Sequence, residues 1–344
     1  MNKKDFTSIL DSIKNDISTQ DKNSKVLIVD SMNTFLRCFT VINVMNLNGH
    51  HVGGLTGFLK SVGYAIKLLR PTRVILVFDG IGGSDSRKNL YSEYKGNRNI
   101  KRVTNWEGFD TRDEESESMS AQMSRLINYL EELPVDMIVV DKVEADDVMA
   151  YATHKLKSDN NHVTLMSSDQ DFLQLVSRNV SVYSPTKKKI YTPEKVKEEF
   201  GVSSYNFLIK KILMGDKSDN VPGVRGLGPK KLLKLFPELS GDEPVTLQEI
   251  YDKCVENQDD LLPSRIVDFK YQLDINTQLM DLHNPNIPQT DEFEIDEIID
   301  GPTNRLNVGA FVKMCEEDSL QKAFPNVESW LNECFMGLNL YSKK

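Results

Sequence analysis

The stretch KVLIVD at residues 25–30 decides the fold class of this chain, because it is a short apolar run that ends in an aspartate. Three further apolar runs end in, or directly before, an aspartate: Arg73–Asp79, Asp136–Asp141 and His162–Ser168. All are rich in Val, Ile or Leu and too short for a typical helix, which predicts buried strands. Helical patterns separate them, at Leu55–Leu69, Met119–Leu133 and Ala145–Leu156. This alternation predicts βαβ units and an α/β fold around a mostly parallel sheet.

The composition is that of a globular protein, with 344 residues of which 39% are hydrophobic and 27% charged. No apolar run reaches the roughly 18 residues that cross a bilayer, and the charged N-terminus is unlike a signal peptide. Four cysteines without C-x-x-C pairing argue against a zinc site and for a reduced, cytoplasmic compartment. The net charge of −9 is uneven, since residues 245–344 hold 8 basic and 19 acidic residues. The acidic total therefore does not exclude a polyanionic partner for the rest of the chain.

Carboxylates follow the predicted strands and form the main chemical signal. They are Asp30, Asp79, Glu144, Asp146, Asp147, Asp169 and Asp171. In an open parallel sheet the carboxyl ends of the strands form the ligand crevice, so these side chains are predicted to meet at one edge. Such a cluster is costly unless a cation neutralises it, and all-oxygen ligands select Mg²⁺ or Mn²⁺. Ligands for two ions predict in-line phosphoryl displacement.

Each carboxylate also has a simpler interpretation. Asp30 and Asp79 fit turn residues after strands, and the acidic group 144–147 fits a first helical turn that complements the helix dipole. Their shared position at the same end of each strand favours the metal site over these separate roles.

Gly80 to Ser118 interrupts the alternation of strands and helices. Its first part is basic and carries Arg87, Lys88, Lys95, Arg98, Lys101 and Arg102, with Tyr91 and Tyr94 among them. Its second part, Val103–Glu117, is acidic. A charged run alone fits a solvated insertion, but aromatic residues between Arg and Lys indicate a nucleic-acid contact surface.

A second acidic pair, Asp216 and Asp219, precedes a glycine-rich turn. The two are predicted to be further metal ligands, with a polar loop as the alternative. The turn Gly223-Val224-Arg225-Gly226-Leu227-Gly228-Pro229-Lys230-Lys231 has the form of a helix–hairpin–helix. Glycines leave backbone amides unobstructed, and amides at a helix start bind phosphate without reading bases. Gly223, Gly226, Gly228, Lys230 and Lys231 are therefore predicted to contact DNA backbone, with an ordinary helical corner as the alternative.

With these motifs in their order, the chain resembles the 5′ nuclease (flap endonuclease) superfamily, and most of all bacteriophage 5′→3′ exonucleases and phage ribonuclease H. The resemblance runs from about Lys25 to Phe236 and also uses Tyr94-Lys95-Gly96-Asn97-Arg98. It implies a PIN-like α/β fold with a helical arch, and Mg²⁺-dependent cleavage near 5′ ends or flaps of DNA. RNA in RNA–DNA hybrids is a further substrate that it implies, and a phage-encoded protein would act in the host cytoplasm.

The resemblance also implies roles for residues. The first ion would be held by Asp30, Asp79, Glu144, Asp146 and Asp147, and the second by Asp169, Asp171, Asp216 and Asp219. Lys95 and Arg98 match catalytic basic residues at the arch base, while Arg87, Lys88 and Tyr94 would contact DNA. The hairpin would hold duplex backbone with a K⁺ ion on its carbonyls, and Mn²⁺ would substitute for Mg²⁺.

We expect four segments: an N-terminal amphipathic helix (1–24), a nuclease domain (25–192) with its arch at about 80–118, a helix–hairpin–helix region (193–244), and an acidic, mainly helical C-terminal region (245–344). The N-terminal helix either caps the core of the protein or tethers the protein to a sliding clamp or a single-strand DNA-binding protein. The protein is expected to be a monomer.

Three alternative functions are a PIN-type ribonuclease, a small-molecule phosphatase and a non-catalytic DNA-binding module. The hairpin and the complete set of carboxylates disfavour all three.

Overall fold

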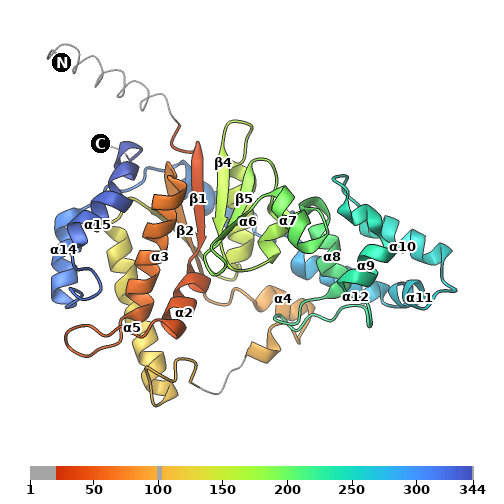
Figure 1. Cartoon of the computed structure of the whole chain (residues 1–344), viewed down its shortest axis with the longest axis horizontal. Coiled ribbons are helices and arrows are strands. Elements are labelled where there is room, and N and C mark those ends of the chain that lie inside the picture. The colour runs from red at the N-terminus through yellow and green to blue at the C-terminus, as the bar shows by residue number, and fades with distance from the viewer. Residues whose placement is uncertain (1–20, 99–102, 343–344) are drawn as a thin grey trace, which may run out of the picture.

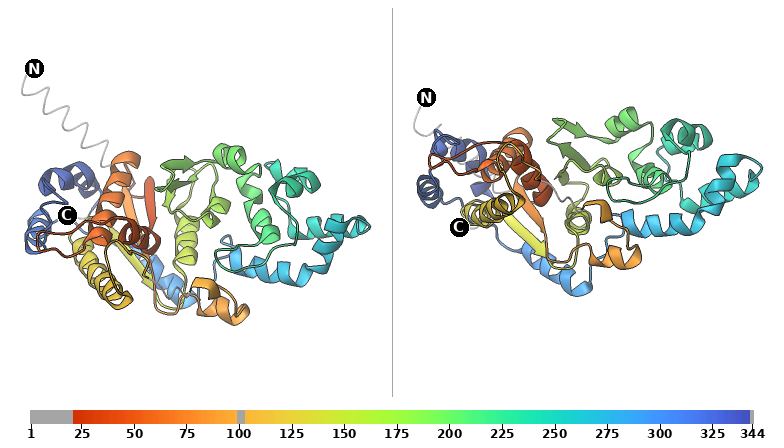
Figure 2. Two further views of the ribbon diagram at one scale, coloured as in Figure 1. Left: turned by 60° about the horizontal axis from the view of Figure 1, so that its bottom comes forward. Right: turned by 90° about the horizontal axis from the view of Figure 1, so that it is seen from below.

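The computed structural model describes residues 21–98 and 103–342. Residues 1–20 of the predicted N-terminal helix (1–24) and the predicted basic residues Lys101 and Arg102 lie outside this part of the chain. Figure 1 shows a sheet in the middle of an elongated molecule, with α14 (Val308–Glu317) and α15 (Val327–Cys334) at one end and the helices of residues 207–280 at the other. The further views in Figure 2 agree, and they show α4 (Asp85–Leu90) between the sheet and the latter helices.

The described residues form a six-stranded sheet with the order β3-β2-β1-β4-β5-β6. Its strands are β1 (Lys25–Asp30), β2 (Arg73–Asp79), β3 (Asp136–Val140), β4 (His162–Met166), β5 (Val180–Ser184) and β6 (Lys189–Tyr191). The first five pair in parallel, and β6 pairs antiparallel to β5 at the edge. The predicted α/β fold with a mostly parallel sheet is confirmed.

Both faces of the sheet are buried, which explains why the strands are apolar throughout. Leu27 and Val29 face a layer that contains α2 (Ser31–Val41), α3 (Gly53–Leu69) and α5 (Arg112–Glu131). Val26 and Ile28 face the other layer, with α6 (Ala145–Leu156) and α13 (Gln289–Asp300). Successive residues of a strand point to opposite faces, so one apolar run supplies both cores.

The acidic C-terminal region, residues 245–344, contributes to three different hydrophobic cores. After α13, the helices α14 (Val308–Glu317), α15 (Val327–Cys334) and η5 (Met336–Leu340) return to the α3 and α5 layer. Phe311 packs edge-on against Tyr129 of α5, with ring centroids 4.8 Å apart. Residues 308–340 therefore complete the first core, which no pattern within them predicted.

Residues 247–280 of that region belong instead to a separate helical lobe with its own core. This lobe consists of α8 (Phe207–Met214), α9 (Pro229–Leu235), η4 (Pro237–Ser240), α10 (Leu247–Glu256), α11 (Leu261–Asp268) and α12 (Lys270–Met280). The preceding α7 (Pro193–Phe200) and η3 (Ser204–Asn206) lead into it, and Val196 of α7 is buried in the core between the sheet and α6. Ile212 on α8, Leu232 on α9 and Leu273 on α12 are buried together there. Gly223 to Gly228 lie between α8 and α9. Val224 and Leu227 of this turn share the core with Ile266 of α11 and Leu273 of α12, so these two helices support the turn.

Short helices surround the carboxyl ends of the strands: α4 (Asp85–Leu90), η1 (Gly96–Arg98) and η2 (Asp171–Leu175). The helix α5 begins at Arg112, seven residues before the predicted start at Met119. Thr111 caps it by accepting a hydrogen bond from the amide of Glu114, and the acids 113–115 complement the dipole of its first turn. Part of the predicted acidic arch is thus regular helix.

No described helix combines the length and apolar character that a membrane span requires.

Candidate metal centre and nucleic-acid interface

The strands β2, β1 and β4 are neighbours, and each is followed by acidic residues at its carboxyl end. Asp30 ends β1 and Asp79 ends β2, while Asp169 and Asp171 follow β4. Glu144, Asp146 and Asp147 come at the start of α6, which follows β3. The sheet order therefore brings the predicted carboxylates to one edge, as a parallel sheet requires.

Asp30 and Asp79 also perform the capping roles that were the simpler alternative. The carboxylate of Asp30 caps α2 by accepting from the amide of Asn33 at 3.1 Å, and it accepts from the Ser167 hydroxyl at 2.8 Å. Asp79 accepts at 3.0 Å from the amide of Ala145, the first residue of α6. These bonds fix the carboxylates at the edge without neutralising their charge, so capping and ion binding are compatible.

Burial and repulsion within the cluster both raise the pKa values of its carboxyl groups. Burial, with help from Asp79 and Asp169, raises the pKa of Asp30 to about 6. Burial also raises the pKa of Asp146 well above its ordinary value, and Asp169 and Asp30 raise it further. A divalent cation would relieve this repulsion, and the oxygen-only donors fit Mg²⁺.

The fit to a hard divalent cation rests on the kind of donor at this edge of the sheet. Within residues 21–98 and 103–342, no three Asp, Glu, His or Cys side chains are grouped closely enough to hold an ion by themselves. The donors of the cluster are all carboxylate oxygens, which suit Mg²⁺, an ion that usually keeps several water ligands.

Asp147 and Arg87, which were predicted to bind metal and DNA, are paired with each other. Arg87 is only 7% exposed, and its guanidinium donates to both oxygens of Asp147, at 2.5 and 3.1 Å. It also donates to Glu144 at 2.9 Å and to the carbonyl of Leu279 at 2.9 Å. Asp147 thus lies in a buried ion pair, and Arg87 joins α4 to α6 and α12.

Tyr94 and Lys95 lie at the junction between the two groups of carboxylates. Tyr94 is 4% exposed, and its hydroxyl lies 3.2 Å from a carboxylate oxygen of Glu144 and 3.2 Å from one of Asp219, either of which can accept its single hydrogen. Tyr94, which was predicted to contact DNA, therefore presents its ring and its hydroxyl to the protein. The ammonium of Lys95 donates to Glu144 at 2.8 Å. Burial lowers the pKa of Lys95, but Glu144 and Asp146 outweigh it and hold that pKa above its usual value.

Two other predicted basic residues lie nearby. Lys88 is exposed on α4 and can reach a ligand. Arg98 belongs to η1, next to Lys95 along the chain, and its side chain lies outside the described part of the structure.

Lys211 is a member of the site that the sequence analysis missed. It is 8% exposed, and its ammonium contacts Asp171 and Asp216 together. Burial and Asp169 raise the pKa of Asp171 to about 7 despite this contact. Burial would also raise the pKa of Asp216, yet Lys211 and bonds from Ser218 lower it to about 2. The signal in the sequence was a lysine within the apolar run Phe207–Met214, five residues before Asp216.

The glycine turn lies beside this second group. Gly215 has φ +68° and packs against Gly223, where a Cβ would lie 2.0 Å from the carbonyl of Met214. Asp216 and Val221 exchange two backbone hydrogen bonds, at 2.9 and 2.7 Å, which hold the turn next to the carboxylate. Gly226 has φ +86° at the tip, Gly228 precedes α9, and the side chains of Lys230 and Lys231 are exposed. The turn therefore connects Asp216 to the start of α9, where two basic side chains are exposed.

Comparison with known proteins identifies the family. Residues 25–201 match the N-terminal resolvase-like domain of 5′-3′ exonucleases. A 5′-3′ exonuclease of Bacillus subtilis is 31% identical over 274 residues, which cover 76% of this chain and 84% of that protein.

This chain belongs to the 5′-3′ exonuclease family.

Other relatives extend this picture. A 5′-3′ exonuclease of Aquifex aeolicus is 29% identical over 219 residues, 63% of this chain and 71% of the relative. DNA polymerase I of Bacillus subtilis is 29% identical over 257 residues, 71% of this chain but 27% of the polymerase. The bacteriophage T5 flap endonuclease, in a complex with DNA and metal ions, covers 89% of this chain and 98% of its own, with a TM-score of 0.62 and 20% identity. That likeness shows the PIN-like fold of this 5′-3′ exonuclease.

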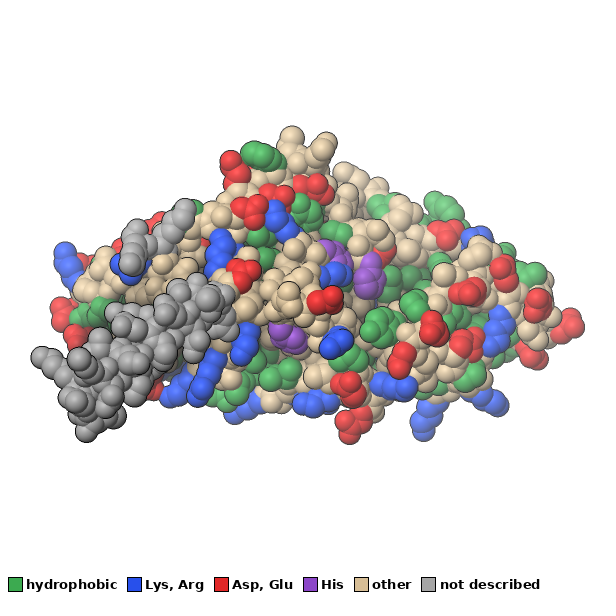
Figure 3. All heavy atoms as spheres, turned by 90° about the horizontal axis from the view of Figure 1, so that it is seen from above, with side chains coloured by type: hydrophobic (Ala, Val, Ile, Leu, Met, Phe, Trp, Pro, Cys, Tyr) green, Lys and Arg blue, Asp and Glu red, His purple; other side chains and the backbone are tan. Residues whose placement is uncertain are grey.

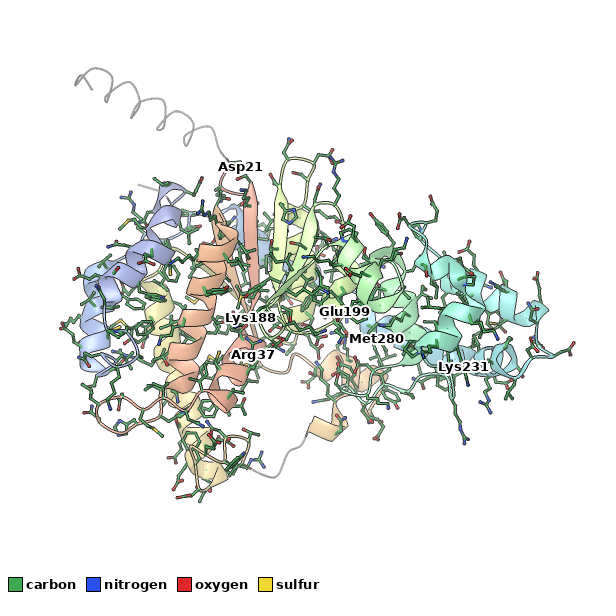
Figure 4. The ribbon with its side chains drawn as sticks, in the orientation of Figure 1. Asp21, Arg37, Lys188, Glu199, Lys231 and Met280 are labelled. Carbon is green, nitrogen blue, oxygen red and sulfur yellow. The ribbon has the colours of Figure 1, made fainter. Side chains whose placement is uncertain are left out.

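A groove on the other side of the carboxylates adds basic residues to the exonuclease site. Arg37 on α2 donates at 2.7 Å to the hydroxyl of Ser168, the residue before Asp169. With Lys60, Tyr64 and Lys188 it lines a groove of about 710 Å³. Figure 4 shows Arg37 and Lys188 close together below β1, far from Lys231 in the helical lobe. Arg37 therefore brings one end of this groove next to the residue that precedes Asp169.

The groove at the opposite end of the sheet is lined by both basic and acidic side chains. A groove of about 720 Å³ there is lined by Arg178 and Lys197 but also by Glu194, Glu198 and Asp242. Figure 3 shows basic and acidic side chains intermixed on that face. The candidate site therefore lies at the carboxyl ends of the strands.

Proposed function

We propose that this member of the 5′-3′ exonuclease family is a Mg²⁺-dependent, structure-specific 5′ nuclease. It hydrolyses phosphodiesters near 5′ ends and flaps of DNA, and RNA primers in RNA–DNA hybrids, in DNA replication or repair. The observation that carries this proposal is the set of carboxylates at the ends of β1, β2 and β4, with Lys95 beside them.

The proposed ligands follow from the positions of the side chains. Asp30, Asp79, Glu144 and Asp146 would hold one ion, and Asp169, Asp171, Asp216 and Asp219 a second. Such ions activate water and stabilise the attacking and leaving oxygens, and Mn²⁺ would substitute for Mg²⁺. Lys95 carries its charge into the cluster, where it would contact the scissile phosphate, and Arg98 follows it on η1.

The remaining contacts are proposed to hold the DNA. Lys88, Lys230 and the hairpin glycines would contact backbone phosphates without reading the sequence. Tyr94 would act indirectly, since its hydroxyl joins Glu144 to Asp219 and so links the two carboxylate groups. Residues 1–24 would serve as a tether to a sliding clamp or a single-strand DNA-binding protein.

A parallel cleavage assay tests the proposal. The substrates are a 5′-end-labelled flap, a nicked duplex and an RNA–DNA hybrid, each with Mg²⁺ and with chelator. We expect short labelled products near the junction or the 5′ end, which depend on Mg²⁺ and disappear in chelator. Cleavage of single-stranded RNA alone, or cleavage in chelator, would refute the proposal.

A further inference from the structure

The segment 279–282, at the end of α12 and directly after it, contacts the surroundings of both carboxylate groups. It lies beyond residues 25–201, which match the 5′-3′ exonuclease domain. Figure 4 shows Met280 on the side of the strands that faces the helical lobe. The buried side chains of the segment are Leu279, Met280 and Leu282.

Side chains of this segment pack against residues that adjoin the carboxylates. Leu279 and Met280 share a small buried core with Tyr94 and Val221. The hydroxyl of Tyr94 lies within hydrogen-bond distance of two proposed metal ligands, and Val221 exchanges backbone hydrogen bonds with Asp216. The segment therefore supports residues next to the carboxylates of both groups.

Gln174 on η2 joins the backbone of this segment to that of Asp171. It is 2% exposed, and its side-chain nitrogen donates to the carbonyl of Asp171 at 2.8 Å and to that of Met280 at 3.0 Å. Its side-chain oxygen accepts from the backbone amide of Leu282 at 3.0 Å. These bonds use both hydrogens and the oxygen of the side chain, so they fix its orientation. Asp171 is thereby tied to a segment that lies 106 positions beyond Gln174 in the sequence.

Anchoring of this kind matters for Asp171 because its carboxylate is repelled by those of Asp169 and Asp216. Like charges move apart unless the backbone that carries them is held in place. We propose that Gln174 is a positioning residue, which holds Asp171 in place for a metal ion by tying its backbone to the segment 279–282. Groups that orient metal ligands in this way affect how tightly the ion binds. This inference rests on the proposed function, in which Asp171 helps to hold the second ion.

Asn206 on η3 supplies a matched control, since it is also a buried amide that ties backbone segments together. It is fully buried, and its side-chain oxygen accepts from the amide of Val245 at 2.7 Å. Its nitrogen donates to three carbonyls between residues 239 and 243. None of residues 239–245 is a proposed metal ligand, so loss of Asn206 should disturb the fold without disturbing the carboxylates.

The first test counts the ions that the full-length protein binds in the absence of DNA. Mn²⁺ is titrated into the wild type, Gln174→Met and Asn206→Leu, and the free ion is measured by electron paramagnetic resonance. We expect the wild type to bind two ions. Gln174→Met should bind one of them roughly tenfold less tightly, because losing a group that orients a ligand costs about 10- to 100-fold in affinity. Asn206→Leu should bind both ions as the wild type does.

Melting curves separate this effect from a loss of stability. Both substitutions remove a buried amide and leave its partners without their hydrogen bonds, so both should lower the melting temperature. Unchanged Mn²⁺ affinity in Gln174→Met, or an equal weakening in Asn206→Leu, would overturn the inference. Failure of the wild type to bind any ion would instead refute the proposed function.

The second test uses only the wild type, so it does not depend on whether a variant folds. Coupling is reciprocal: if the contact of Gln174 with Leu282 favours the ion, the ion stabilises that contact by the same factor. We therefore expect saturating Mg²⁺ to slow hydrogen exchange of the Leu282 amide by roughly tenfold. The amide of Val245, which Asn206 holds, should exchange at the same rate with and without Mg²⁺. Exchange of Leu282 that Mg²⁺ leaves unchanged, in a protein that binds the ion, would overturn the inference.

Discussion

At the scale of single residues, the site depends on carboxylates that repel one another, and Asp146 is the best probe of them. Asp146→Asn removes one charge at nearly constant shape. We expect Mg²⁺-dependent cleavage to fall by at least about 100-fold, because metal activation supplies several kcal/mol, while DNA binding persists. Steady-state cleavage and a binding titration measure the two effects.

Asp141→Asn is the matched control for this prediction. Asp141 follows β3 at the same edge of the sheet, but its carboxylate accepts from the amide of Ile81 at 2.9 Å, a bond that asparagine can keep. Similar losses of cleavage in the two variants would contradict a specific role for Asp146.

Lys211 gives a second prediction at this scale. Lys211→Met leaves Asp171 and Asp216 without their shared cation, and breaking a buried ion pair on one side costs about 3 to 5 kcal/mol. We expect the free energy of unfolding in urea to fall by that amount, and Mn²⁺ to raise it more in the variant than in the wild type. The reason is that the ion then meets carboxylates with no competing ammonium.

The neighbouring Lys210 supplies the control. Its ammonium lies over the rings of Phe207 and Phe200, at 4.2 and 4.6 Å from their centroids, and burial lowers its pKa to about 8. Lys210→Met should therefore cost less and gain nothing from Mn²⁺. Equal costs for the two lysines would count against the bridging role of Lys211.

At the scale of elements, His51 joins the loop after α2 to the base of the arch and to α5. Its ring lies 3.0 Å from the carbonyl of Ile42, 3.3 Å from the amide of Asn105 and 3.0 Å from the amide of Gln122. These contacts fit a neutral ring, since a second N–H would face the NH₂ group of Gln122. Burial accordingly lowers the pKa of His51.

This lowered pKa makes stability depend on pH. Below about pH 6.5 the unfolded chain binds a proton at this position before the folded protein does, so the free energy of unfolding falls as the pH falls. One such group contributes at most about 1.4 kcal/mol per pH unit. Urea unfolding between pH 7 and pH 5 should therefore show a shallower decline in His51→Gln than in the wild type, with His50→Gln as the control. Identical slopes in all three proteins would contradict the prediction.

At the scale of the whole molecule, residues from the C-terminal region complete a core that begins with β1. Phe311 is fully buried against α5, whereas Phe293 on α13 is 65% exposed. Phe311→Ala should lower the free energy of unfolding by about 3 to 5 kcal/mol, because it leaves a cavity. Phe293→Ala should stay within about 0.5 kcal/mol of the wild type. Chemical denaturation measures both, and equal effects would show that α14 does not belong to the folding unit of the sheet.

The strands and the shared edge of their terminal carboxylates followed from the order of residues alone. Asp30 and Asp79 end apolar runs, and the apolar character of a buried parallel strand is a local property that any window of the chain displays. The glycine turn was likewise readable, since Gly215, Gly223 and Gly226 meet steric demands within a dozen residues. The positions of Asp30 and Asp79 at one edge of the sheet then follow from the parallel order of the strands.

The partners of charged side chains were decided only by tertiary packing. Arg87 looked like a residue for DNA until the fold placed Asp147, 60 positions away, against it. Lys211 reaches Asp171 across 40 positions, and Arg265 reaches the hairpin across another 40. A charge can be satisfied by any opposite charge or carbonyl that comes within about 3 Å. Which one comes so close depends on how α6, α8 and α11 pack, and packing is set by the whole core and not by the residues next to the charge.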